Sequence, residues 1–158
     1  MPRLKVPMLD QQHTILAVDD EPANLRLLER LLRNHYKVLT ATSGEQAIRI
    51  LSHAKVSLII TDQRMPGMTG TELLRKSRTL DPDMVRMVVT ANNDADTFID
   101  AIKNSGAIRV INKPWDPDKV LELVHSALAK YEILVGNKQA INRLKQANAD
   151  LGKAIKRQ

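Results

Sequence analysis

The sequence contains no cysteine, very few aromatic residues and no long hydrophobic run. Without cysteine the chain can form neither a disulfide framework nor a zinc–thiolate site, and it has no cysteine nucleophile. Aromatic residues make up only 3% of the 158 residues, which argues against the stacking platforms that hold single-stranded nucleic acids. The apolar runs are too short to cross a bilayer, and residues 1–13 lack the apolar stretch of a secretory signal. We therefore expect a soluble, cytoplasmic protein that binds no membrane.

The formal net charge of +6 is concentrated at one end of the chain. Residues 1–135 hold 18 Lys and Arg against 17 Asp and Glu, whereas residues 137–158 hold six basic residues against one acidic residue. A strong positive charge often marks a surface that binds nucleic acid. Here the excess belongs to a short C-terminal segment, so we expect no direct nucleic-acid partner.

Short runs of β-branched and apolar residues alternate with segments whose apolar residues have helical spacing. The five predicted strands are 14–18, 36–41, 56–61, 84–90 and 108–111. Ser43 and Thr69 each begin a capping-box spacing, so both predict helix starts. Phe98 and Ile102 indicate the fourth of five helices. The alternation predicts an α/β, doubly wound parallel sheet with helices on both faces.

Five polar residues follow or end four of the predicted strands: Asp19, Asp20, Asp62, Thr90 and Lys113. Ligands of open α/β sheets bind outside the carboxyl ends of the strands, so we expect these side chains to share one pocket. Three neighbouring carboxylates repel one another unless a cation lies between them. Oxygen ligands in an open site favour Mg²⁺, which takes phosphate as a further ligand. With Lys113 as a second cation, the pattern predicts phosphoryl transfer to Asp62, giving an aspartyl phosphate.

Four separated segments of the sequence resemble the receiver domain of two-component response regulators. They are residues 15–21, 59–70, 88–91 and 112–115. The resemblance extends over roughly residues 14–130 and implies a flavodoxin-like five-stranded sheet of order 2-1-3-4-5 with five helices. It also implies a partner, either a sensor histidine kinase or a phosphotransfer protein.

The resemblance implies roles for the acidic residues of the pocket. Asp62 would be the phosphoacceptor. Asp20, Asp62 and the backbone carbonyl of Arg64 would bind Mg²⁺ directly, and Asp19 would act largely through water. The chain would catalyse only its own phosphotransfer and dephosphorylation, so it would not be an enzyme in the ordinary sense.

Further roles follow for the residues around the phosphoryl group. Thr90 would donate a hydrogen bond to it, Lys113 would pair with it, and the bond between Lys113 and Pro114 would be a cis peptide. Receivers commonly carry Tyr or Phe three residues before the lysine, and here that residue is Val110. Valine has little to swing inward, so we expect the phosphorylation chemistry to survive and its readout to differ.

The C-terminal segment has the heptad pattern of a coiled coil. The seam positions are Ile141, Leu144, Asn148, Leu151 and Ile155. The asparagine stands at an a position, which favours a parallel two-stranded coiled coil in fixed register. Gly136 with Asn137 predicts a break or phase shift in the helix. The predicted parts are a flexible N-terminal extension (1–13), a receiver domain (14–135) and a helical linker or coiled coil (136–158).

The leading interpretation is a phosphorylation-dependent switch that acts through the C-terminal helix on an output domain absent from this chain. We expect a homodimer, through that helix, through the face between the fourth and fifth helices, or through both. Gln63, Arg64 and Trp115 resemble the variant found in receivers of hydrogenase-type transcription regulators or of cyclic-di-GMP output domains. The alternatives are an aspartate-nucleophile phosphatase, a basic coiled-coil DNA-binding module, and, for the tail alone, a frayed helix. The four histidines have no metal-ligand spacing and are expected at the surface.

Overall fold

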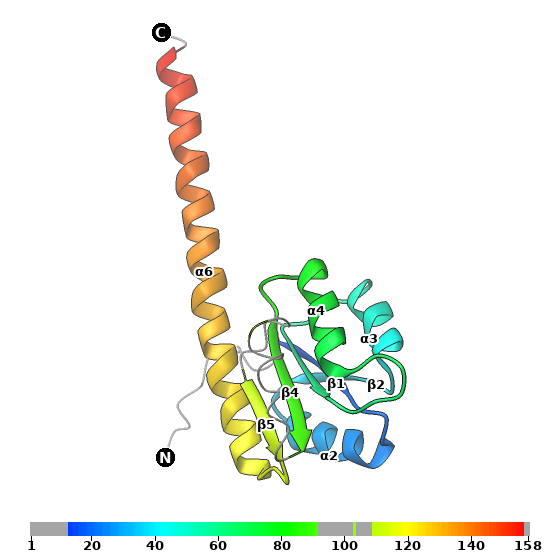
Figure 1. Cartoon of the computed structure of the whole chain (residues 1–158). Coiled ribbons are helices and arrows are strands. Elements are labelled where there is room, and N and C mark those ends of the chain that lie inside the picture. Colours follow the sequence, from blue (N-terminus) through cyan, green and yellow to red (C-terminus); the bar gives the residue numbers. More distant parts are fainter. Residues whose placement is uncertain (1–12, 92–102, 104–108, 157–158) are drawn as a thin grey trace, which may run out of the picture.

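The computed structural model of the chain has a parallel five-stranded sheet at its centre (Figure 1). The structure describes residues 13–91, 103 and 109–156. The strands are β1 (Thr14–Val18), β2 (Lys37–Ala41), β3 (Leu58–Asp62), β4 (Val85–Ala91) and β5 (Arg109–Lys113). Their order is β2-β1-β3-β4-β5, and every adjacent pair is parallel. The predicted sheet and its flavodoxin-like order are confirmed.

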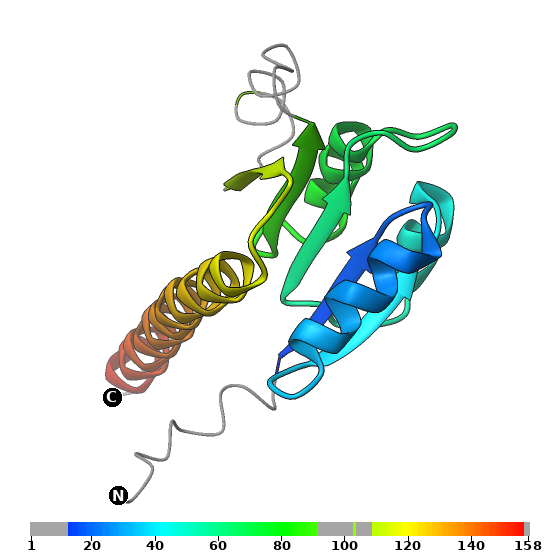
Figure 2. The ribbon, with the colours of Figure 1, turned by 90° about the horizontal axis from the view of Figure 1, so that it is seen from below.

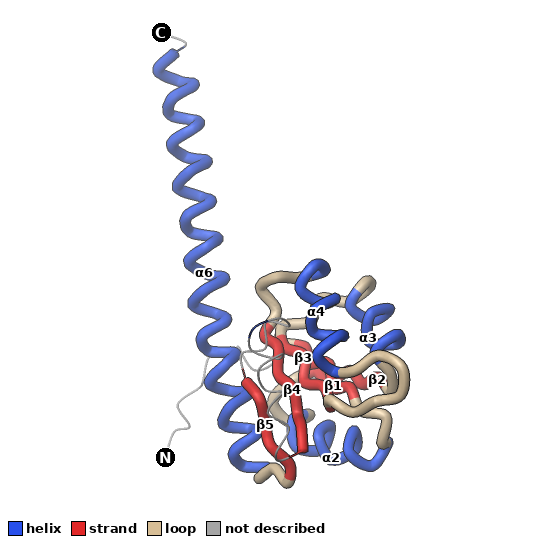
Figure 3. Tube along the Cα trace, in the orientation of Figure 1, coloured by secondary structure: helices blue, strands red, loops and turns tan. Residues whose placement is uncertain are grey.

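Helices cover both faces of this sheet (Figures 2 and 3). Within the described ranges they are α2 (Pro22–Leu32), α3 (Gly44–Leu51), α4 (Gly70–Leu80) and α6 (Pro117–Lys156). Leu28 of α2 and Val124 of α6 belong to the core on one face, whereas Ala47 of α3 and Leu73 of α4 belong to the core on the other. None of the described helices has the length and apolar character needed to cross a membrane.

The helix starts follow the local signals in the sequence. Pro22 is the first residue of α2, where its missing N–H leaves no bond unmade. The Ser43 hydroxyl accepts a hydrogen bond from the Gln46 amide at the start of α3 (3.1 Å), and Thr69 caps α4 through the Glu72 amide (3.3 Å). These caps fix where each chain segment turns from the strand-end edge of the sheet into a helix.

The C-terminal part differs from the prediction, because the fifth predicted helix and the C-terminal extension form one continuous helix, α6. The sequence predicts a break or a phase shift at Gly136; the break is wrong, because α6 continues through this residue. A glycine inside a helix costs only about 1 kcal/mol relative to alanine, and the helix-forming residues on both sides outweigh it. The fourth predicted helix, marked by Phe98 and Ile102, lies outside the described residues.

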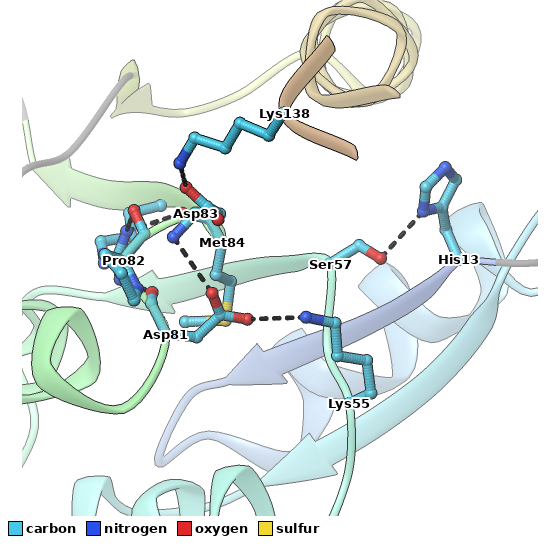
Figure 4. A network of polar contacts seen from close by, with 9 residues as sticks. His13, Lys55, Ser57, Asp81, Pro82, Asp83, Met84 and Lys138 are labelled. Carbon is cyan, nitrogen blue, oxygen red and sulfur yellow. Dashed lines mark hydrogen bonds and ion pairs between the residues drawn. The ribbon is translucent and has the colours of Figure 1, made fainter. Parts of the chain in front are cut away.

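His13 is buried beside α6, contrary to the expectation that the histidines lie at the surface. Its Nδ1 atom lies 2.8 Å from the Ser57 hydroxyl (Figure 4). Its Nε2 atom lies 2.7 Å from a carboxylate oxygen of Glu132, close enough for an ion pair though not aligned for a hydrogen bond. The start of β1 therefore contacts α6 where that helix passes the edge of the sheet.

A second polar contact joins α6 to the loop between α4 and β4. The Lys138 ammonium forms an ion pair with the Asp83 carboxylate in this loop (Figure 4). Arg86, a buried arginine of β4, donates hydrogen bonds to the Met84 carbonyl (2.6 Å) and the Ser77 hydroxyl (2.9 Å). Because Arg86 fixes the loop from inside, Asp83 is presented to α6 from a rigid base.

We expect Lys138→Ala to lower the free energy of unfolding by about 0.5 kcal/mol, as is usual for a half-exposed ion pair. Local opening of α6 near residue 138 should increase, and amide hydrogen exchange would detect it. Lys145→Ala is the matched control, because Lys145 is exposed and lies one heptad further along α6. Equal exchange in both variants would contradict a tether at Lys138.

Candidate functional site

The predicted site residues lie at the carboxyl edge of the sheet. Asp62 ends β3 and Lys113 ends β5, while Asp19 directly follows β1. Neighbouring strands are in parallel register there, with Asp62 opposite Val89 and Ala91 opposite Lys113. The sheet therefore brings together residues that are far apart in the sequence.

Three carboxylates form an acidic cluster at this edge. Asp19, Asp20 and Asp62 each offer an oxygen atom, and these atoms lie within 4.8 Å of one another. Asp19 and Asp62 are buried, whereas Asp20 is exposed. This donor set fits Mg²⁺, which prefers oxygen ligands and retains several waters on its open side.

Asp19 is held in place from the start of α2. One of its carboxylate oxygens accepts a hydrogen bond from the Glu21 amide (2.9 Å), and the other accepts one from the Asn24 side chain (3.1 Å). Burial raises the pKa of Asp19, and the neighbouring Asp62 carboxylate raises it further; the two hydrogen bonds and Lys113 only partly offset this. The ionised form of Asp19 is therefore destabilised when no cation is bound.

We expect Asp19→Asn to raise the free energy of unfolding by about 1 kcal/mol at neutral pH without Mg²⁺. A carboxyl group whose pKa is raised in the folded state makes the protein less stable as the pH rises. This loss of stability begins near the group's ordinary pKa of 3.8 and is complete above its pKa in the folded state. The advantage of the variant should therefore disappear in acid. Urea unfolding at neutral and acidic pH measures this, and a less stable variant at neutral pH would contradict it.

Asp62 has the one counter-ion that the described residues place in direct contact with it. The Lys113 ammonium lies 2.8 Å from an Asp62 carboxylate oxygen. Lys113 is about a third exposed, at 37%, whereas the Asp62 side chain is 8% exposed. The lysine can therefore move toward solvent while Asp62 stays fixed, which leaves room for a group bound to Asp62.

Thr90 is buried in β4, one residue beyond the position opposite Asp62. Val110 in β5 packs against the core on the α3 and α4 face, and it pairs with Val88 of β4. The Lys113–Pro114 peptide bond is cis, the isomer that the resemblance implies.

The loop after Asp62 returns the chain to the start of α4. Gly67 adopts a φ of +77°, which only glycine adopts readily. Arg64 lies in this loop with an exposed side chain. Gln63 is held by backbone and side-chain hydrogen bonds that link β3, β4 and α4. Sequence reasoning did not assign Gln63 a role, because no spacing rule connects it to a residue across an irregular loop.

The predicted coiled-coil residues lie on the projecting part of α6 (Figure 1). Ile141, Leu144, Leu151 and Ile155 are between 50% and 66% exposed, and Asn148 is exposed with them. These residues thus form an apolar stripe, with one asparagine, that no described part of the chain covers.

A family model supplies the deciding comparison. The model of the response regulator receiver domain matches residues 15–125, well over half of the chain. The chain belongs to the response regulator receiver family. Receiver domains conventionally bind Mg²⁺ at an acidic pocket, and the cluster around Asp62 has the oxygen donors for it. Receiver domains of response regulators interact with histidine kinases or phosphotransfer proteins.

Curated relatives of this receiver domain are transcriptional regulators. The hydrogenase transcriptional regulatory protein HoxA of Cupriavidus necator is 39% identical over 121 residues, which is 77% of this chain and 25% of HoxA. The transcriptional regulatory protein ZraR of Klebsiella oxytoca is 36% identical over 77% of this chain and 28% of its own length. The chain spans about a quarter of the length of these relatives.

Solved structures match the receiver fold over nearly their whole length. A response regulator receiver domain protein from Clostridium thermocellum superimposes with a TM-score of 0.72 at 30% identity, covering 77% of this chain and 98% of that chain. A structure described as adenylate cyclase from Rhodopirellula baltica gives a TM-score of 0.78 at 30% identity, covering 82% of this chain and 97% of that chain. The same fold thus occurs in proteins with different descriptions.

Proposed function

We propose that this receiver domain is a phosphorylation-dependent signalling switch and that Asp62 accepts the phosphoryl group. The observation that carries the proposal is the position of the Asp62 carboxylate, which lies 2.8 Å from Lys113 and within the acidic cluster. An Asp62 oxygen attacks the phosphorus of a phosphohistidine on the kinase or phosphotransfer protein. The phosphorus–nitrogen bond breaks as the phosphorus–oxygen bond forms, and the leaving imidazole keeps its electron pair and takes a proton from water.

The residues around Asp62 divide the work of binding and charge neutralisation. Asp19, Asp20, Asp62 and the backbone carbonyl of Arg64 would hold Mg²⁺. When bound, Mg²⁺ supplies positive charge to the carboxylates and to the phosphoryl oxygens. Lys113 follows the developing charge because its ammonium already contacts Asp62 and is partly exposed. Thr90 donates a hydrogen bond from β4 to a phosphoryl oxygen.

Phosphorylation then shifts a conformational equilibrium that reaches α6. Val110 replaces the aromatic residue common at its position, so the change is carried by backbone and packing shifts in β4 and β5 rather than by a swinging ring. Because α6 packs on β4 and β5 through Val120 and Val124, a shift there changes the direction in which the projecting helix points. The recipient is an output domain outside this chain.

The apolar stripe on α6 supports a homodimer of this chain as the signalling unit. Residues 124, 131 and 138 face the body of the domain, and helix geometry puts the stripe roughly a third of a turn away from them. Two copies can therefore pair along the stripe without displacing either body. Asn148 would pair with its counterpart and favour a parallel dimer in one register.

The switch acts in the cytoplasm, binds no nucleic acid directly, and catalyses only its own phosphotransfer and dephosphorylation. A phosphatase with an aspartate nucleophile needs a second acid–base carboxylate two residues further on, and Arg64 occupies that position. Steady turnover of a generic phosphate ester would revive that alternative.

The test is incubation with acetyl phosphate and Mg²⁺, followed by intact-mass measurement and light scattering. We expect a gain of one phosphoryl group and a change in the monomer–dimer equilibrium, both prevented by EDTA. No mass gain would overturn the switch. A mass gain with a monomer at all concentrations would overturn the dimer and leave the phosphorylation site standing.

A further inference from the structure

We propose that Gln63 is a positioning residue that fixes Asp62 to the first turn of α4. The inference rests on the proposed function, because it concerns how the phosphoacceptor and its metal ligands are held. Gln63 directly follows Asp62 in the chain, so any force on Gln63 acts on Asp62 through one peptide bond.

Gln63 is fixed on both sides by hydrogen bonds. Its backbone amide donates to the Val89 carbonyl of β4 (2.9 Å), and its backbone carbonyl accepts from the Gly70 amide of α4 (3.0 Å). Its side-chain carbonyl accepts from the Thr71 amide (2.9 Å), and its side-chain amide donates to the Thr71 hydroxyl (3.2 Å). One residue thus connects the neighbouring strand to the helix.

Two of these hydrogen bonds satisfy backbone N–H groups at the start of α4 that have no partner within the helix. The first N–H groups of an α-helix have no acceptor within the helix. Gln63 accepts from two successive ones, at Gly70 and Thr71, and Thr69 accepts from the next, at Glu72. Gln63 therefore ties both ends of the loop that contains Arg64, the residue whose carbonyl is proposed to bind Mg²⁺.

The alternative is that Gln63 only caps the start of α4 and has no effect on the site. Thr69 offers a matched comparison, because it caps the same helix but, among the described residues, forms no hydrogen bond to Asp62 or Gln63. If Gln63 acts only as a cap, then Gln63→Met and Thr69→Ala should have the same consequences. If Gln63 positions the site, only Gln63→Met should weaken metal binding.

The experiment measures Mn²⁺ binding as a probe of the Mg²⁺ site, by loss of the free Mn²⁺ electron paramagnetic resonance signal. We expect Gln63→Met to weaken Mn²⁺ binding roughly tenfold, the lower end of the effect of losing a residue that orients metal ligands. Thr69→Ala should bind Mn²⁺ with an affinity within about twofold of the wild type. Its urea unfolding midpoint should nevertheless fall by about as much as that of Gln63→Met. Gln63→Glu keeps an acceptor for Thr71 and should restore most of the affinity.

The outcomes separate the two proposals. Equal Mn²⁺ affinity in Gln63→Met and Thr69→Ala would overturn the positioning role while the wild type still binds and is phosphorylated. A Gln63→Glu variant that binds Mn²⁺ roughly tenfold more weakly than the wild type would overturn it as well, and this comparison with the wild type remains available if Gln63→Met does not fold. A wild-type chain that binds neither Mn²⁺ nor a phosphoryl group would instead overturn the proposed function.

Discussion

Asp62→Asn is expected to gain no phosphoryl group from acetyl phosphate and Mg²⁺, under conditions in which the wild type gains one. The amide is a poor nucleophile and cannot form the acyl phosphate, while its size and hydrogen-bonding shape are nearly those of the carboxylate. Intact-mass spectrometry measures the gain directly. The fold should persist. The substitution loses the ion pair between Asp62 and Lys113, but it also removes the repulsion between Asp62 and Asp19, and the second effect offsets the first.

The control for this prediction is Asp81→Asn. Asp81 lies in the loop between α4 and β4 and pairs with Lys55 at 3.3 Å, at the opposite edge of the sheet from Asp62. We expect this variant to be phosphorylated like the wild type. A phosphoryl group on Asp62→Asn, or its loss from Asp81→Asn, would place the acceptor outside the acidic cluster.

Much of the site could be predicted because a parallel sheet imposes a simple rule on strand ends. Asp62 and Lys113 end two different strands, and the sheet order brings the carboxyl ends of those strands to one edge. Their contact at 2.8 Å follows from the topology, and the predicted alternation of strands and helices implies that topology. Periodicity in the sequence carries that information even though 51 residues separate the two side chains.

Other features were beyond sequence reasoning, because they depend on contacts between irregular segments. The bonds from Gln63 to Thr71 cross a loop whose shape depends on Gly67 and on the position of α4. The burial of His13 depends on where α6 passes the start of β1. The break predicted at Gly136 relied on an intrinsic preference of about 1 kcal/mol, which neighbouring residues readily override.

The same helix serves the core and the proposed dimer because its two apolar stripes are out of phase. Val124 and Tyr131 are buried against the sheet, while Ile141, the first residue of the apolar stripe, is 50% exposed. The ion pair between Lys138 and Asp83 lies between these two regions. Because this ion pair holds α6 to the body of the domain, the projecting part of the helix cannot move freely on its own. A shift of the sheet near Asp62 would therefore move the helix as a whole and reorient the apolar stripe with it.

Gly70→Ala is expected to lower the free energy of unfolding by about 3 kcal/mol, the upper part of the usual range for overpacking. A Cβ atom at this position would lie 2.4 Å from the Asp62 carbonyl oxygen and 3.0 Å from the Gln63 Cα atom. Both neighbours are backbone atoms of the phosphoacceptor segment and cannot rotate away. Moving them displaces the Asp62 carboxylate, so phosphorylation should slow at least tenfold, since misplacement by about 1 Å can cost more than that.

Gly136→Ala is the matched control, because this glycine is also helical but its Cβ position has no neighbour within 4 Å. There the substitution should raise the free energy of unfolding by about 0.5–1 kcal/mol and leave phosphorylation unchanged. Urea unfolding and the rate of mass gain with acetyl phosphate measure both variants. The same substitution should therefore change the free energy of unfolding with opposite sign at the two positions. A Gly70→Ala variant that is stable and rapidly phosphorylated would mean that the close approach of α4 to Asp62 does not hold the acceptor in place.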